Sequence, residues 1–101
     1  MKVYISGPIT GTDDHMDRFQ AAEEQLRREG YIPYNPAAIN AMMPVEADYE
    51  EYMAVSMTIL DKCEAIYQLR GWEKSPGANR EYGYALGTDK IIMREIKEEK
   101  Q

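Results

Sequence analysis

The chain has 101 residues, of which 44% are hydrophobic and 30% charged, a composition typical of globular proteins. Its length suits one domain over residues 1–101, and no apolar run approaches the roughly 20 residues of a membrane span, so we expect no membrane partner. The net charge of −6, without a basic patch, disfavours binding to a nucleic-acid polymer.

Strands and helices are predicted to alternate along the chain. Short apolar runs bounded by glycine or proline predict strands, and apolar residues at helical spacing predict helices. In chain order, we expect a strand at 2–6, a loop at 7–12, a helix from an Asp13 or Asp14 cap to Gly30, a strand at 31–34, an irregular connection at 35–44, a helix at 48–62, a strand at 65–69, a loop at 71–74, a helix from Ser75, a strand at 90–93 and a charged surface or frayed helix at 94–101.

This alternation predicts an α/β fold, a three-layer sandwich with a parallel sheet of four or five strands. In such sheets, ligands bind beyond the carboxyl ends of the strands. The loops at 6–12 and 71–75 both leave strands at that end. We therefore expect a small-molecule pocket between these two loops.

Glu81 is the first candidate for chemistry. Ser75 is a suitable N-cap and Pro76 a suitable first helical residue, so the helix begins near Ser75. Positions 81, 82, 85 and 86 then share one face, which we expect to point toward the sheet. Because burying an unpaired charge costs free energy, a buried carboxylate is expected to have a hydrogen-bond or ion-pair partner or a chemical role. Glu81 is therefore a nucleophile, a general acid, or a buried residue paired with Arg80 or a tyrosine hydroxyl.

The loop after the first strand offers backbone amides ahead of a helix, a setting that suits an anion or a hydroxyl-rich ligand. An ordinary strand-to-helix turn is the alternative interpretation, and the nearby aspartates disfavour a tightly bound phosphate. The candidate binding residues here are Ser6, Gly7, Pro8, Ile9 and Gly11.

Several other residues have two possible roles. Trp72 either stacks on a planar base or packs against neighbouring side chains. Tyr49 and Tyr52 are expected in the core or at a subunit contact, and His15 at the surface. Cys63 is expected in the core, since no histidine is placed to activate it. We expect no metal or other cofactor, because clustered ligand spacing is absent.

Two groups of residues together resemble the nucleoside 2-deoxyribosyltransferase-like superfamily, over residues 2 to about 93. Within this superfamily, the chain resembles a branch of small bacterial and phage proteins that carry a Gly-Trp-Glu-x-Ser-x-Gly-Ala signature. The matching residues are Val3-Tyr4-Ile5-Ser6-Gly7-Pro8-Ile9-Thr10-Gly11, the pairs Gly30-Tyr31 and Asn35-Pro36, and Gly71-Trp72-Glu73-Lys74-Ser75-Pro76-Gly77-Ala78 followed by Glu81 and Ala85.

The resemblance implies a flavodoxin-like or Rossmann-like sandwich that forms a homodimer or larger homo-oligomer. It also implies that Glu81 attacks the anomeric carbon of a nucleoside or nucleoside monophosphate, that Tyr4 positions Glu81, and that Ser75 helps to bind phosphate. Gly77 and Ala78 of the signature belong to the same implied binding site.

The chain departs from the superfamily at one position. Where these enzymes usually hold an aspartate on the second helix, this chain has Ser56 on the stripe expected to face the pocket. A hydroxyl does not act as a carboxylate acid or base at neutral pH. Asp61 substitutes only if the helix has a different register.

Two functions are favoured by the sequence, and a structural or regulatory oligomer with a vestigial pocket is a third possibility. One is an enzyme, a deoxyribosyltransferase or nucleotide N-glycosidase, that acts through Glu81. The other is a non-catalytic protein of the same fold that binds a nucleotide-derived ligand. The first residues lack the apolar segment of a signal peptide, and a single cysteine forms no internal disulfide, so we expect a cytoplasmic location.

Overall fold

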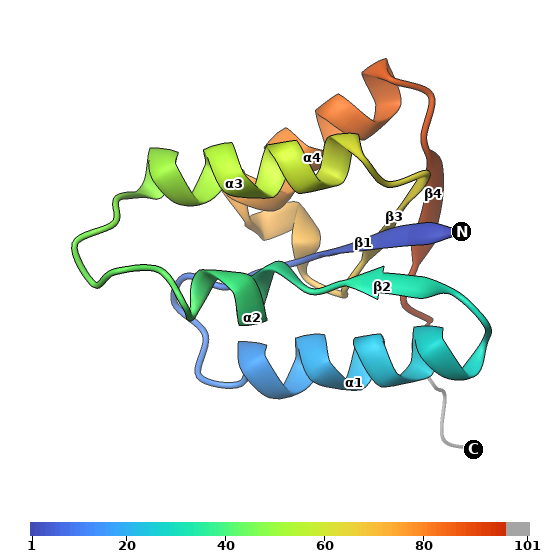
Figure 1. Cartoon of the computed structure of the whole chain (residues 1–101), viewed down its shortest axis with the longest axis horizontal. Coiled ribbons are helices and arrows are strands. Elements are labelled where there is room, and N and C mark those ends of the chain that lie inside the picture. Colours follow the sequence, from blue (N-terminus) through green and yellow to red (C-terminus); the bar gives the residue numbers. More distant parts are fainter. Residues whose placement is uncertain (97–101) are drawn as a thin grey trace.

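A computed structural model describes residues 1–96 of the chain and contains one parallel sheet with strand order β2-β1-β3-β4. The chain runs through β1 (Lys2–Ser6), α1 (His15–Arg28), β2 (Ile32–Tyr34), α2 (Pro36–Asn40), α3 (Tyr49–Asp61), β3 (Ala65–Gln68), the 3₁₀ helix η1 (Trp72–Lys74), α4 (Pro76–Gly87) and β4 (Ile91–Arg94) (Figure 1).

Helices cover both faces of the sheet, with α1 on one side and α3 and α4 on the other (Figure 1). Alternate residues of each strand point to opposite faces, so β1 sends Val3 and Ile5 toward Phe19 and Leu26 of α1. Its Tyr4 packs instead with the second core, which includes Leu60, Cys63, Ile66 and Ala85. The predicted three-layer α/β sandwich is confirmed, with four strands.

Side-chain capping marks the start of α3 and of α4, whereas Asp14 at the start of α1 makes no side-chain cap hydrogen bond. The Asp48 side chain accepts a hydrogen bond from the Glu51 amide, and the Glu51 side chain accepts one from the Asp48 amide, which forms a complete capping box at the start of α3. Ser75 caps α4 by accepting from the Ala78 amide at 3.2 Å, as the sequence predicts.

The connection at 35–44, predicted as irregular, contains the short helix α2. Asn35 caps this helix by accepting a hydrogen bond from the Ala38 amide, and Pro36 occupies its first position. A five-residue helix is too short to display an apolar period, so periodicity alone misses it.

Two other predictions at the C-terminal side are wrong. Leu86, assigned to the inward face of α4, is 51% exposed, because the buried stripe of this helix is Ala78, Glu81 and Ala85. Arg94, assigned to a terminal helix, is the last residue of β4, and residues 95 and 96 are not helical. The remainder of that predicted helix, residues 97–101, lies outside the described residues.

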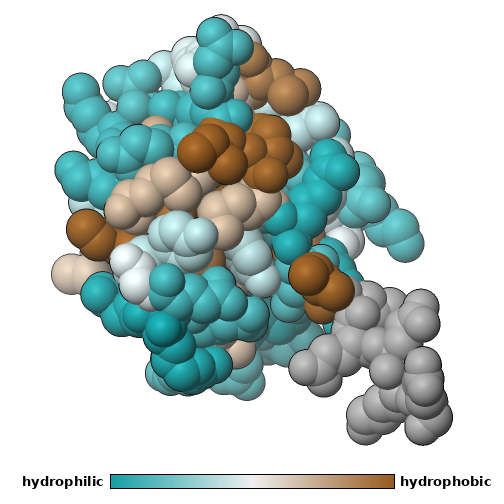
Figure 2. Space-filling view, turned by 90° about the vertical axis from the view of Figure 1, so that its right-hand side faces the viewer, coloured by the Kyte–Doolittle hydropathy of each residue, from teal (hydrophilic) through white to brown (hydrophobic). Residues whose placement is uncertain are grey.

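Apolar side chains reach the surface in places. Figure 2 shows a group of them set among hydrophilic side chains on the face that is turned right in Figure 1. Across the described surface, both edge strands contribute exposed isoleucines, Ile32 of β2 and Ile91 of β4. None of the described helices combines the length and apolarity needed to cross a membrane.

Gly7, directly after β1, lies against the core so closely that an added methyl group has no room. A Cβ at this position would lie 2.8 Å from Cβ of the fully buried Leu69. We expect Gly7→Ala to lower the free energy of unfolding by about 1–3 kcal/mol, measured by chemical denaturation. The matched control is Gly83→Ala on α4, where an added Cβ meets nothing within 4 Å and alanine should stabilise the helix slightly. Equal effects of the two substitutions would contradict this account.

Candidate active site

Glu81 of α4 lies over the carboxyl end of β1 and accepts two hydrogen bonds from it. The Tyr4 hydroxyl donates to Oε2 at 2.5 Å, and the Ser6 hydroxyl donates to Oε1 at 2.6 Å. The side chains of Tyr4 and Ser6 point to the same face, because they are two residues apart on a strand. One strand therefore holds both oxygens of the carboxylate.

All three side chains are buried, with Glu81 exposing 6% of its surface and Tyr4 none. Burial raises the pKa of Glu81 above its ordinary value, although the hydrogen bonds from Ser6 and Tyr4 act in the opposite direction. Burial also raises the pKa of Tyr4 well above its ordinary value, and the charge of Glu81 raises it further. Tyr4 is thus a stable neutral donor, and Glu81 is a carboxyl group with a raised pKa.

A cavity of about 590 Å³ lies beside Glu81, between the carboxyl end of β1 and the starts of α1, α3 and α4. This volume is in the range of small-molecule sites. Among the described residues, Glu81 is the only carboxylate in its wall, and no lysine or arginine lines it. Most of the wall is apolar or aromatic, including Ile9, Phe19 and Met53.

The structure brings most of the predicted site residues to this cavity. Its lining includes the predicted residues Tyr4, Gly7, Ile9, Ser56, Ser75, Gly77, Ala78 and Glu81. Ser6 lies outside the lining and reaches the site through its hydrogen bond to Glu81. Pro8, Gly11 and Trp72 do not line the cavity.

Trp72 lies in η1 and contacts a different set of side chains. Its ring is 4.8 Å from that of Tyr82, centroid to centroid, and the Arg94 guanidinium lies 5.6 Å from its centroid. Of the two roles open from the sequence, the structure has Trp72 packed against neighbouring side chains. The left-handed Gly71 before it turns the chain at this point.

The cavity wall also contains polar residues that sequence reasoning did not assign to it. His15, predicted at the surface, is half-buried and lines the cavity, as do Tyr49 and Tyr52, which we expected in the core or at a subunit contact. Asn40 of α2 lines it too, and its buried Oδ1 has no hydrogen-bond partner among the described residues. The sequence pattern that could have predicted α2 is an N-cap residue, Asn35, followed by a proline, Pro36, at the first helical position.

Other candidate partners and nucleophiles lie elsewhere. Arg80 forms an ion pair with Glu50 at 3.0 Å rather than with Glu81. Asp61 accepts a hydrogen bond from Tyr84 and is absent from the cavity wall, so it does not replace the missing aspartate. Burial raises the pKa of the Cys63 thiol to about 11, which leaves it unreactive at neutral pH. Within residues 1–96, no three His, Cys, Asp or Glu side chains are grouped as metal ligands.

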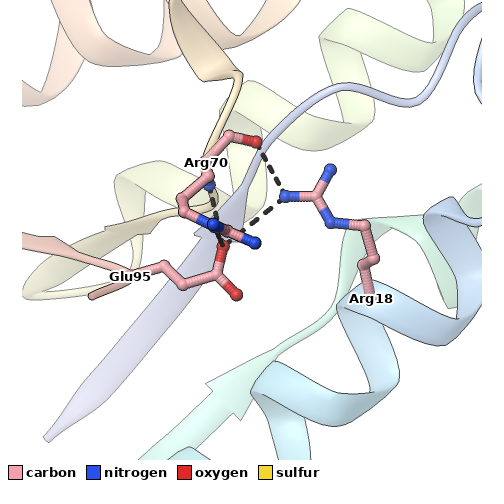
Figure 3. A network of polar contacts seen from close by, with 3 residues as sticks. All are labelled: Arg18, Arg70 and Glu95. Carbon is pink, nitrogen blue, oxygen red and sulfur yellow. Dashed lines mark hydrogen bonds and ion pairs between the residues drawn. The ribbon is translucent and has the colours of Figure 1, made fainter. Parts of the chain in front are cut away.

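A network of polar contacts beyond the carboxyl ends of β3 and β4 holds the chain where it leaves β3 (Figure 3). Glu95 accepts a hydrogen bond from the Arg70 amide at 2.9 Å, and Arg18 of α1 donates to the Arg70 carbonyl at 2.7 Å. The network links α1 with the segments that follow β3 and β4. The path from β3 to the Ser75 cap therefore begins at a fixed point.

Comparison with known proteins identifies a family and a fold. No curated protein sequence matches the chain. The chain superimposes on a 2-deoxyribosyltransferase from the psychrotolerant bacterium Bacillus psychrosaccharolyticus with a TM-score of 0.75 and 16% identity, covering 97% of this chain and 77% of that one. It superimposes on a 2-deoxyribosyltransferase from Leishmania mexicana with a TM-score of 0.69 and 18% identity, covering 92% of this chain and 62% of that one.

The chain thus spans less than two thirds of the Leishmania protein. The two similarities show that its fold is 2-deoxyribosyltransferase-like. A match over residues 1–94 shows that the chain belongs to the family described as a domain of unknown function, DUF4406.

Proposed function

We propose that this protein binds a nucleoside or nucleoside monophosphate and cleaves or exchanges its N-glycosidic bond through Glu81. The observation that carries the proposal is a buried carboxylate in the wall of a ligand-sized cavity, with both oxygens oriented by hydroxyl donors. The 2-deoxyribosyltransferase-like fold supports it.

In the proposed reaction, a carboxylate oxygen of Glu81 forms a bond to the anomeric carbon of the sugar. The bond from that carbon to the base nitrogen breaks, and its electron pair leaves with the base, which takes up a proton from water. Water or a second base then attacks the same carbon and releases Glu81 as a carboxylate. Hydrolysis results in the first case and deoxyribosyl transfer in the second.

The hydrogen bonds to Glu81 suit this role. Each carboxylate oxygen accepts one hydrogen bond, which leaves lone pairs free for the attack. The donors from Tyr4 and Ser6 stabilise the ionised form that the attack requires and fix the direction of the side chain. Activity should therefore fall as the pH drops through the pKa of Glu81, which burial places above the ordinary carboxyl value.

The remaining cavity residues supply contacts for the ligand. The unpartnered Oδ1 of Asn40 is an acceptor for the donor edge of a base, and the rings of Tyr49 and Tyr52 offer apolar surface to its plane. The start of α4 at Ser75 and Gly77 suits a sugar hydroxyl or a 5′-phosphate, because its amides point outward from the helix end.

One observation favours a second function, ligand binding without turnover. Among the described residues, no carboxylate other than Glu81 lines the cavity, and the buried Ser56 stands where the resemblance places an aspartate. Without that second acid, the described cavity wall holds no carboxyl group besides Glu81 that could protonate the departing base. This alternative uses the same cavity and the same fold. We further propose that the chain is a single domain that forms a homo-oligomer. We also propose that the Gly71–Ala78 segment marks a branch of 2-deoxyribosyltransferase-like proteins.

A substrate panel separates the two functions. The purified protein is incubated with purine and pyrimidine deoxynucleosides, ribonucleosides and their monophosphates, and the free base is measured by chromatography. Calorimetry on the same panel measures binding. Release of a free base supports the enzyme, and saturable binding without release supports the alternative. Neither binding nor release for any compound would contradict both.

A further inference from the structure

The wall of the cavity beside Glu81 contains residues from both helical layers of the fold. Phe19 of α1 packs with Ile5 on one face of the sheet, and Tyr4 packs with residues of α3 and α4 on the other. Figure 1 shows α1 on the opposite side of the sheet from α3 and α4. His15, the first residue of α1, and Glu81 of α4 therefore reach the cavity from opposite layers.

The proposed reaction gives the two sides of the cavity different roles. A carboxylate that forms a bond to the anomeric carbon attacks from the side opposite the bond that breaks, so the base departs away from Glu81. Besides Glu81, the titratable side chains of the described wall are His15 and three tyrosines. Tyr4 donates to Glu81, while Tyr49 and Tyr52 belong to α3, in the same layer as α4 (Figure 1). His15 is thus the titratable side chain of the described wall on the side of the departing base.

His15 is half-buried, and one edge of its ring is turned toward the backbone. Its Nδ1 lies 3.4 Å from the Thr12 carbonyl oxygen, which only accepts hydrogen bonds. Nδ1 therefore carries the hydrogen of this contact, and Nε2, on the other side of the ring, is the nitrogen that gains and loses a proton. Imidazole is the side chain that ordinarily exchanges a proton near neutral pH, which suits it to act as both acid and base.

We infer that His15 is the catalytic acid and base of the proposed reaction, with Nε2 facing the base of the bound nucleoside. As Glu81 bonds to the anomeric carbon, the electron pair of the breaking bond leaves with the base, and the Nε2 proton of the imidazolium passes to a nitrogen of the base in place of a proton from water. The neutral Nε2 then takes a proton from the water or second base that attacks the same carbon, which restores the imidazolium and releases Glu81. This role rests on the proposed function and deepens it.

The first experiment compares two nucleosides that differ in whether the departing base needs a proton. The base of 7-methyl-2′-deoxyguanosine carries a positive charge and leaves as a neutral molecule, whereas the base of 2′-deoxyguanosine leaves as an anion unless it is protonated. His15→Gln keeps a hydrogen-bond donor but exchanges no proton. We expect it to lower kcat for 2′-deoxyguanosine about 10²-fold, and kcat for the methylated nucleoside less than about threefold.

Arg28→Gln is the matched control, because it replaces a basic side chain with the same amide at an exposed residue in the last turn of α1. It should change kcat for neither nucleoside. An equal loss on both nucleosides in His15→Gln, or no loss on 2′-deoxyguanosine, would overturn the role of His15 in proton transfer.

A second measurement needs neither turnover nor a substitution at residue 15. His15 is the only histidine of the chain, so its imidazole nitrogens give unambiguous NMR signals. In Glu81→Gln, which should not consume the ligand, we expect saturating 2′-deoxyguanosine to shift the Nε2 signal more than the Nδ1 signal, because Nε2 faces the base. Base release by the wild type together with an unmoved Nε2 signal contradicts only the role of His15. The absence of base release by the wild type contradicts the proposed function itself.

Discussion

Glu81→Gln is expected to abolish base release, by about 10³-fold or more, while leaving ligand binding within a few fold of the wild type. The amide keeps the shape of the side chain and still accepts a hydrogen bond from Tyr4 or Ser6 through its oxygen. It does not form the ester to the anomeric carbon. Chromatography measures free base, and calorimetry measures the dissociation constant on the same preparations.

The control for this substitution is Glu73→Gln in η1. It makes the same chemical change at an exposed side chain outside the cavity wall. We expect it to change neither base release nor binding. Base release by Glu81→Gln at the wild-type rate would show that Glu81 is not the nucleophile.

The strands and the long helices could be predicted from the sequence because their signals are local. The buried residues Phe19, Ala22 and Leu26 recur at helical spacing, and glycine or proline lies within three residues of the carboxyl ends of β1, β2 and β3. Strand pairing follows from the alternation of strands and helices, since a parallel sheet is the usual outcome of that order. These features predicted that Glu81 faces the sheet, and in the structure it is buried and hydrogen-bonded to Tyr4 and Ser6 of β1.

The rest of the cavity could not be predicted, because it depends on where separate elements meet. Asn40 belongs to a helix too short to show an apolar period, and no local pattern places its side chain in the wall of the cavity that Glu81 lines. The prediction that His15 lies at the surface rests only on its sequence neighbours, which do not reveal the residues from other elements that surround it in the cavity wall. The turn at Gly71 and η1 places Trp72 against Tyr82 and Arg94, a contact that joins three separate segments.

Tyr4→Phe is expected to lower the free energy of unfolding by about 1.5–3 kcal/mol at neutral pH, because it removes a buried hydrogen bond to a carboxylate. Phenylalanine fills nearly the same volume, so the loss of packing is small. The cost should shrink as the pH falls, since a protonated Glu81 no longer needs a charge-stabilising donor. Urea unfolding at a series of pH values measures it.

The direction in which pH changes the stability cost of Tyr4→Phe follows from the raised pKa of Glu81. A carboxyl group whose pKa is higher in the folded than in the unfolded protein makes folding less favourable as the pH rises from the ordinary value through the raised one. Removing the Tyr4 donor raises the folded pKa further, which widens this window and makes the variant lose more stability at its upper end. Below the ordinary carboxyl pKa, the extra loss disappears, and only the loss of a neutral hydrogen bond remains.

Measuring Tyr4→Phe in the Glu81→Gln variant as well as in the wild type separates the interaction between Tyr4 and Glu81 from other effects of the substitution. In Glu81→Gln, residue 81 carries no proton to titrate, so adding Tyr4→Phe should cost less at neutral pH than in the wild type, and that cost should not change across the acid range. The difference between the two backgrounds is the coupling of the phenol to the charged carboxylate. A cost of Tyr4→Phe that is equal in both backgrounds and at every pH would mean that Glu81 is already protonated in the folded protein, which is incompatible with a nucleophile.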